Sequence, residues 1–200
     1  MNIQSKGLFQ KKKKTRQLID QEIYNIGAVL LESELMNRAK TQRHHMSTTL
    51  YDHTMEVSRK SVMLCNKLEK RGKHVDRKNV IIGALCHDLA MVGRDEKYIS
   101  GKEACKRHPI ESAEIAKDFF PDINDETVRT IERHMWPLTP DPPVSLEDWV
   151  VSQADKEASV KCFITEGGKK SFYKGKHILL NTAEKFSPFV SSFMQAKNEY

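Results

Sequence analysis

Two side chains that bind metal ions stand next to each other in His87-Asp88, directly after the apolar run 80–86. An ionised carboxylate that is buried without a partner is strongly destabilising or takes up a proton. A metal ion would satisfy the imidazole and the carboxylate together. Because a single His-Asp pair arises readily by chance, the argument depends on whether further ligands converge on it.

Further potential ligands lie along the predicted helices. His53, His134 and Asp155 each stand about one turn from an apolar residue of the same stripe, and His108 is expected at a helix start. A lone histidine on an apolar face is more often a hydrogen-bonded core residue than a ligand. Several histidines and two aspartates on the inward faces of separate helices favour a metal site, and imidazole with carboxylate suits Mn, Fe, Co, Ni or Zn.

The spacing of apolar residues predicts the helices that position these ligands. They are expected over 15–38, 52–70, 76–88, 108–120, 124–135 and 145–163. Gly72 is expected as a left-handed cap, and His108-Pro109 followed by Glu111 is typical of a helix start. Residues 1–14 are predicted to be loose and 39–51 to form a loop, and no strand is predicted. Short helices joined by short loops indicate an all-α fold.

A chain of 200 residues suits one main domain with short additions. We predict a basic arm and N-terminal helix over 1–44, the main domain over 45–165 and a basic C-terminal tail over 166–200. Gly167-Gly168 is expected to end the last helix.

The net charge of +6, to which Lys11–Lys14 contribute, favours an anionic partner such as a phosphorylated small molecule or RNA. No apolar run is long enough for a membrane helix, and none follows Lys11–Lys14 as a secretion signal would require. Cys65 and Cys86 are expected to be buried thiols in a reducing compartment. A cytoplasmic location is therefore predicted, and a homo-oligomer is left open.

The order and context of the ligands resemble the HD superfamily of metal-dependent phosphohydrolases. The resemblance covers about residues 45–165 and rests on the segments 51–57, 83–88, 108–113, 131–137 and 153–156. It implies an all-α, compact HD-domain helical bundle with a metal site at its centre.

The same resemblance implies two divalent ions, from among Fe, Mn, Co, Ni, Mg and Zn. One would be held by His53, His87, Asp88 and Asp155, and the other by Asp88, His108 and His134, with Asp88 bridging. The chain has Met135 where some two-metal members carry a second histidine, and it lacks the lysine that some dinucleotide hydrolases carry shortly after His-Asp. The resemblance therefore does not identify a substrate.

The implied function is hydrolysis of a phosphomonoester or phosphodiester, of a nucleotide or a similar anion, by a metal-activated water. Asp88 would be catalytic, and Lys156, Arg94 and Lys102 are candidates to neutralise phosphate, although plain surface solvation explains each as well. His44 and His45 are interpreted as loop residues in preference to groups that support the metal ligands from behind. His74 and His177 are expected to have no role.

Two other functions remain compatible with the sequence. The same ligand set would serve a di-iron oxygenase of the HD fold. A non-catalytic module that binds RNA or another anion through the basic arm, with a vestigial metal site, is the third reading.

Overall fold

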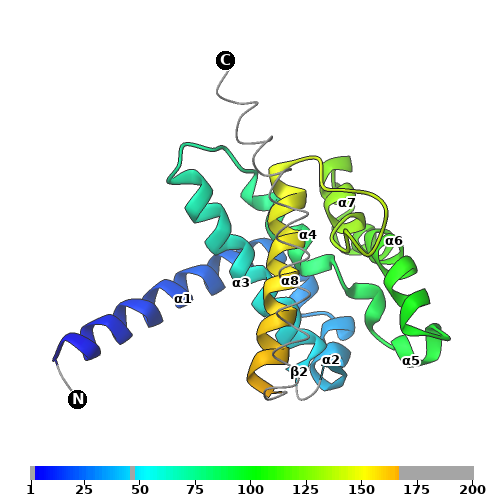
Figure 1. Cartoon of the computed structure of the whole chain (residues 1–200), viewed down its shortest axis with the longest axis horizontal. Coiled ribbons are helices and arrows are strands. Elements are labelled where there is room, and N and C mark those ends of the chain that lie inside the picture. Colours follow the sequence, from blue (N-terminus) through cyan, green and yellow to red (C-terminus); the bar gives the residue numbers. More distant parts are fainter. Residues whose placement is uncertain (1–2, 46–47, 167–200) are drawn as a thin grey trace.

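Helices supply nearly all of the regular structure in the computed structural model, which describes residues 3–45 and 48–166 (Figure 1). The α-helices are α1 (Ile3–Leu31), α2 (Glu34–Thr41), α3 (Leu50–Glu69), α4 (Arg77–Cys86), α5 (Arg94–Lys97), α6 (Gly101–Phe119), α7 (Asp125–Glu132) and α8 (Leu146–Glu166). A 3₁₀ turn, η1, spans Leu89–Met91, and the strands β1 (Arg43–His45) and β2 (Thr48–Thr49) pair in antiparallel fashion. The prediction of an all-α fold is confirmed.

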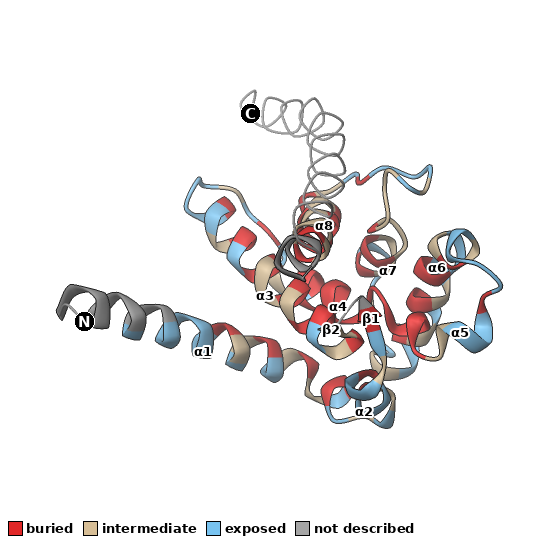
Figure 2. Cartoon of the chain, turned by 60° about the horizontal axis from the view of Figure 1, so that its bottom comes forward, coloured by how far each residue is buried: buried red, intermediate tan, exposed pale blue. Residues whose placement is uncertain are grey.

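Helix α4 lies inside the bundle and separates two apolar clusters. Ile81 and Leu85 pack into the cluster that includes residues of α1 and α6, whereas Val80 and Ala84 pack into the cluster formed with α3 and α8. Every residue of α4 from Asn79 onward is buried, as the continuous red ribbon in Figure 2 shows. The end of α4 therefore delivers His87 and Asp88 into the interior.

Glycine allows α4 to lie close to α7. A Cβ atom at Gly83 would stand 2.8 Å from Cγ2 of Thr130, which is too near for an unperturbed contact. This close approach brings the chain after α7, which carries His134, toward the end of α4.

Two helix starts differ from the sequence prediction. Helix α6 begins at Gly101 rather than at His108, because the Ser100 side chain accepts a hydrogen bond from the Glu103 amide at 3.2 Å. Glu103 in turn accepts from the Ile99 amide at 2.8 Å, so Ser100 and Glu103 cap the helix eight residues before the predicted His108–Glu111 pattern. His108 therefore lies inside a helix, with Pro109 following it.

The N-terminal region is also more helical than predicted. Helix α1 begins at Ile3, within the segment expected to be loose, which is consistent with the good helix propensity of its lysines. The helix expected over 15–38 is interrupted after Leu31, where Ser33 caps α2 by accepting from the Met36 amide. A serine cap at this point ends one helix and starts another.

The segment 39–51 is not the loop that the sequence predicted. Helix α2 extends to Thr41, and β1 and β2 form a short hairpin that leads into α3. Strands of two or three residues are too short to show an alternating apolar pattern, so the sequence carried no signal for them.

Gly72 and two cysteines agree with the sequence prediction. Gly72 adopts a left-handed conformation with φ 74°, and Cys65 and Cys86 are buried free thiols. Over the described residues, the helices are too short or too polar to span a membrane. Gly167-Gly168, His177 and the tail over 167–200 lie outside the described residues, and the proposed division of the chain into domains stays a prediction.

A buried carboxylate joins α7 to α8. Asp148 is fully buried, and its two oxygens accept hydrogen bonds from Thr130 Oγ1 at 2.7 Å, Arg129 Nε at 3.1 Å and the Val144 amide at 3.0 Å. Removal of this carboxylate would leave the Arg129 guanidinium and the Val144 amide without this acceptor, and the Thr130 hydroxyl would keep only the Glu126 carbonyl oxygen at 2.9 Å.

We expect Asp148→Ala to lower the free energy of unfolding by about 3 kcal/mol, since a buried charged hydrogen-bonding group is lost. Urea unfolding followed by circular dichroism measures this change. Asp141→Ala, at an exposed position of the preceding loop, serves as the matched control and should leave stability nearly unchanged. A stability of Asp148→Ala equal to that of the control would contradict this account of the α7–α8 contact.

Candidate metal centre

The structure brings together all of the predicted ligands from distant parts of the chain. His53 lies on α3, and His87 and Asp88 directly follow the end of α4. His108 lies on α6, His134 lies in the turn after α7, and Asp155 lies on α8. All are buried, and the most exposed of them, Asp155, exposes only 8% of its surface.

Asp88 lies between two pairs of histidines. Its Oδ1 atom is 3.1 Å from His108 Nε2 and 3.6 Å from His134 Nε2. Its Oδ2 atom is 3.4 Å from His87 Nε2 and 3.7 Å from His53 Nε2. One carboxylate oxygen therefore faces each pair, which is the arrangement that a bridging ligand requires.

Asp155 completes the group on the Oδ2 side. Its Oδ1 atom lies 3.1 Å from His53 Nε2 and 4.0 Å from His87 Nε2. The ligand atoms of His53, His87 and Asp155 lie within 4.8 Å of one another, as do those of Asp88, His108 and His134. These two groups could each hold a metal ion, and their members agree with the ligand sets that the resemblance implied.

The helical backbone determines which imidazole nitrogen faces the cluster. Because a carbonyl oxygen only accepts hydrogen bonds, each Nδ1 that contacts one must carry the proton, and the Nε2 of the neutral ring then presents a lone pair. This applies to three residues, whose Nδ1 atoms donate to Ala84 (His87, 2.8 Å), Ala104 (His108, 2.7 Å) and Ile131 (His134, 2.7 Å).

The lone pairs of His108 and His134 face each other, because their Nε2 atoms are 3.0 Å apart. Two neutral acceptors at this distance repel each other unless a cation lies between or beside them. The Nε2 atoms of His87 and His53 are 3.4 Å apart. Nδ1 donation to a carbonyl with Nε2 directed inward is also the usual orientation of metal-binding histidines, so the donor set fits divalent metal ions.

The charges of the cluster suit the same purpose. Burial raises the pKa of the Asp88 carboxyl, but the neighbouring His87 and His108 outweigh it and hold the pKa well below its usual value. Burial likewise raises the pKa of Asp155, but the hydrogen bond and charge of His53, together with the charges of His87 and His134, lower it below its usual value. Burial lowers the pKa of His134 to about 4. At neutral pH the centre therefore combines anionic carboxylates with a neutral imidazole, as metal binding requires.

His87 responds differently. Burial lowers its pKa, but the charge and hydrogen bond of Asp88, the charge of Asp155 and the hydrogen bond to Ala84 together outweigh burial and raise the pKa to about 9. A divalent cation would compete with the proton that His87 otherwise binds.

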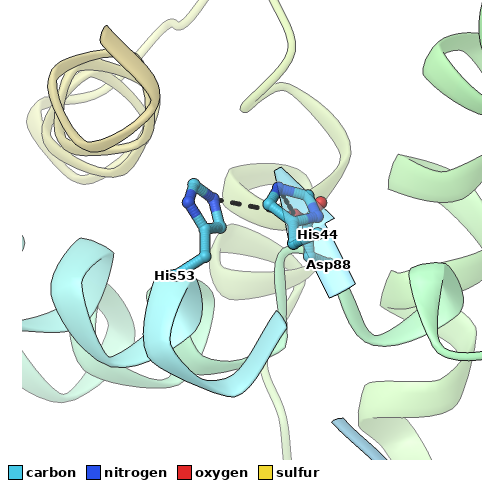
Figure 3. Close-up of side chains that lie close together, drawn as sticks. All are labelled: His44, His53 and Asp88. Carbon is cyan, nitrogen blue, oxygen red and sulfur yellow. Dashed lines mark ion pairs between the residues drawn. The ribbon is translucent and has the colours of Figure 1, made fainter. Parts of the chain in front are cut away.

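One residue of the cluster was missed by the sequence analysis. His44, interpreted there as a loop residue, lies on β1 with only 7% of its surface exposed, and its Nε2 is 3.7 Å from Asp88 Oδ2. Figure 3 shows His44, His53 and Asp88 converging from a strand, a helix and a turn. Helical spacing could not find a strand residue, and its position shortly before His53 was the only available hint.

A pocket of about 250 Å³ borders one side of the cluster. Four of its lining residues, His44, Asp88, His108 and Asp155, belong to the cluster itself. The other walls are mostly apolar and are formed by Met91, Cys105, Met135, Leu138, Lys156, Ser159 and Val160. The candidate metal centre is thus accessible to a small molecule.

Lys156 lines this pocket but is already engaged by the chain. Its Nζ donates to the His134 carbonyl oxygen at 2.8 Å and to the backbone oxygen and the hydroxyl of Ser152 at 3.1 and 2.7 Å. Burial lowers its pKa to about 8. In this arrangement Lys156 holds the backbone of His134 in place, and its predicted contact with phosphate stays a prediction.

The other cations proposed from the sequence lie elsewhere. Arg94 is not one of the described residues that line this pocket. Its Nη1 donates to the His44 carbonyl oxygen at 3.4 Å, so Arg94 supports the hairpin. Lys102 and His74 are exposed. The side chain of His45 lies outside the described part of the chain.

The fold and the site together define a class: a helical bundle that gathers imidazoles and carboxylates from separate helices into a buried metal-binding cluster. A family model for the HD domain matches residues 50–159, which is more than half of the chain. The chain belongs to the HD domain family, within a superfamily of metal-dependent phosphohydrolases. Comparisons with curated proteins and with solved structures returned no match.

We expect divalent metal ions to stabilise the protein, because they bind a cluster that exists only in the folded state. Addition of Mn²⁺ or Co²⁺ at about a hundred times its dissociation constant should raise the free energy of unfolding by about 2.7 kcal/mol, and a chelator should reverse the effect. Thermal unfolding followed by fluorescence measures it.

Asp88→Asn should abolish this stabilisation, since the amide cannot bridge two cations as a carboxylate can. Asp118→Asn, at an exposed position of α6, is the control and should respond to metal like the parent protein. If Asp88→Asn gains as much stability from metal as the control does, the cluster is not the binding site.

Proposed function

We propose that the protein is a metal-dependent phosphohydrolase that cleaves a phosphomonoester or phosphodiester of a nucleotide or a similar small anion. The observation that carries the proposal is the position of Asp88. Its carboxylate lies between two pairs of imidazoles, and it also lines a pocket that a small molecule can enter.

In this proposal the ligands divide as the distances do. His53, His87 and Asp155 would hold one ion and His108 with His134 the other, with Asp88 contributing one oxygen to each. When bound, divalent ions supply a water of lowered pKa and positive charge beside the phosphoryl oxygens.

The protein itself positions these ligands and keeps them in the required protonation states. The three Nδ1–carbonyl hydrogen bonds fix the orientation of the rings, and the buried carboxylates stay ionised. Lys156 and Ser152 both donate to the His134 carbonyl oxygen and so hold that residue next to α8. Preorganised groups of this kind need not rearrange during the reaction.

The pocket supports a substrate with an uncharged portion next to its phosphate. Met91, Met135, Leu138 and Val160 provide apolar surface, on which a nucleobase or another uncharged group could pack. The volume of about 250 Å³ is below the roughly 300–1,000 Å³ of pockets for larger ligands. These features favour a small phosphoester over a polymer strand.

We expect metal-dependent hydrolysis of at least one substrate in a panel of p-nitrophenyl phosphate, bis(p-nitrophenyl) phosphate and nucleoside mono- to triphosphates. Each is assayed with Mg²⁺, Mn²⁺, Fe²⁺, Co²⁺, Ni²⁺ or Zn²⁺. Asp88→Asn should reduce turnover by about a hundredfold or more, because a group that positions both ions is lost. Asp118→Asn should retain the activity of the parent protein.

Equal turnover by Asp88→Asn and the parent protein would assign the activity to a contaminant or to another site. The assays are repeated without oxygen. An activity that needs both iron and oxygen would favour the di-iron oxygenase instead, whereas hydrolysis that continues without oxygen would support the phosphohydrolase.

The N-terminal helix motivates a second proposal, that the basic arm binds RNA. The N-terminal part of α1 extends away from the rest of the molecule (Figure 1), and its residues Lys13, Lys14 and Arg16 are exposed. Exposed lysine and arginine side chains on one helix favour contacts with phosphates, which are independent of sequence.

If this proposal is correct, replacing Lys13, Lys14 and Arg16 by glutamine should weaken binding of single-stranded RNA and flatten its dependence on salt, since fewer counterions are released. Fluorescence anisotropy at several salt concentrations measures both effects. Asp88→Asn should bind RNA like the parent protein. RNA affinity that the triple substitution leaves unchanged would exclude the arm as the binding surface.

A further inference from the structure

The β1–β2 hairpin is attached to the segment that follows the His-Asp pair. Gln42, at the start of the hairpin, donates from Nε2 to the Met91 carbonyl oxygen and accepts from the Gly93 amide, both at 2.6 Å. Arg94 donates to the carbonyl oxygen of His44 itself at 3.4 Å. The hairpin is therefore positioned by the same segment that carries Asp88, although it precedes the part of the chain that matches the HD family.

This attachment directs His44 into the cluster. Its Nε2 faces Asp88 Oδ2 at 3.7 Å, and that oxygen also faces His53 and His87. Ligand atoms of His44, His53 and Asp88 lie within 4.8 Å of one another. The His44 and His53 rings also lie with centroids 4.4 Å apart, but ring packing alone does not require a nitrogen directed at a carboxylate.

His44 and His108 differ from the other three histidines of the cluster in that they line the pocket. His44 lines the pocket together with Asp88, His108 and Asp155, whereas His53, His87 and His134 are not among the lining residues. An anion that entered the pocket and approached a metal ion held by Asp88 would therefore meet the His44 side chain, which lines the same pocket.

We infer that His44 is an additional metal ligand, supplied by the hairpin, and that it holds the coordination position on the pocket side that a phosphate anion takes over. The inference rests on the metal centre proposed above and deepens it. It predicts both weaker metal binding and less hindered phosphate binding when the imidazole is removed.

Cobalt titrations of the full-length protein test the first part. We expect His44→Ala to bind Co²⁺ about tenfold more weakly than the parent protein and to show an altered visible absorption spectrum, since one nitrogen ligand is lost. His74→Ala removes an exposed histidine and is the matched control, with expected affinity and spectrum equal to those of the parent. His44→Gln, which keeps a polar side chain of similar length, should bind Co²⁺ less tightly than the parent.

Folding is checked by thermal unfolding of each variant in the presence of a chelator. If His44→Ala does not fold without metal, His44→Gln takes its place in every comparison. A Co²⁺ affinity and spectrum of the folded variant that match those of His74→Ala would overturn the assignment of His44 as a ligand.

The second part uses inorganic phosphate added to the Co²⁺-loaded proteins and followed by the same absorption bands. Because phosphate no longer competes with the imidazole, we expect it to bind His44→Ala about threefold or more tightly than the parent protein. Equal or weaker phosphate binding by the variant would overturn the proposed exchange of ligands.

Asp88→Asn separates this inference from the metal centre itself. If Asp88→Asn binds Co²⁺ as well as the parent does, the metal centre and the role of His44 fail together. If Asp88→Asn loses Co²⁺ while His44→Ala keeps it, the metal centre stands and only the role of His44 fails.

Discussion

A buried carboxylate surrounded by imidazoles is the constraint on which this structure depends. Asp88 is 6% exposed, and its pKa is held low by His87 and His108 against the opposing effect of burial. A charge in the interior is tolerated only where partners of suitable sign and geometry surround it. The bundle meets this condition by contributing imidazoles from α3, α6, the end of α4 and the turn after α7, and divalent ions would satisfy the remaining lone pairs.

Helix ends and helix interiors both serve this arrangement. The Nδ1 atoms of His87, His108 and His134 donate to carbonyl groups three or four residues earlier, so the local backbone sets the orientation of each ring. Asp148 and Lys156 then hold the region of His134 against α8. The rigidity of the centre therefore comes from ordinary helical hydrogen bonds and a few buried polar groups, before any metal binds.

Much of the site could be predicted because its ligands follow helical periodicity. A polar residue on an otherwise apolar stripe is visible in the sequence, as His53 and Asp155 illustrate, and the order of such residues resembles the HD superfamily. Predictions failed where the signal was local and short. The Ser100 side chain caps α6 well before the apolar stripe of that helix, so the predicted start of α6 was too late. The hairpin with His44 has too few residues to show a pattern.

The sequence by itself determined the all-α fold, the two apolar faces of α4 and which histidines and aspartates of the helices are candidate ligands, because each depends on residue type and spacing along one element. Only the tertiary structure decided which ligands meet around each oxygen of Asp88 and that His44 joins them. It also decided that Arg94 supports the hairpin and that Lys156 contacts the His134 carbonyl oxygen. Those outcomes depend on how elements far apart in the chain pack, and spacing within one helix carries no information about the distance to another.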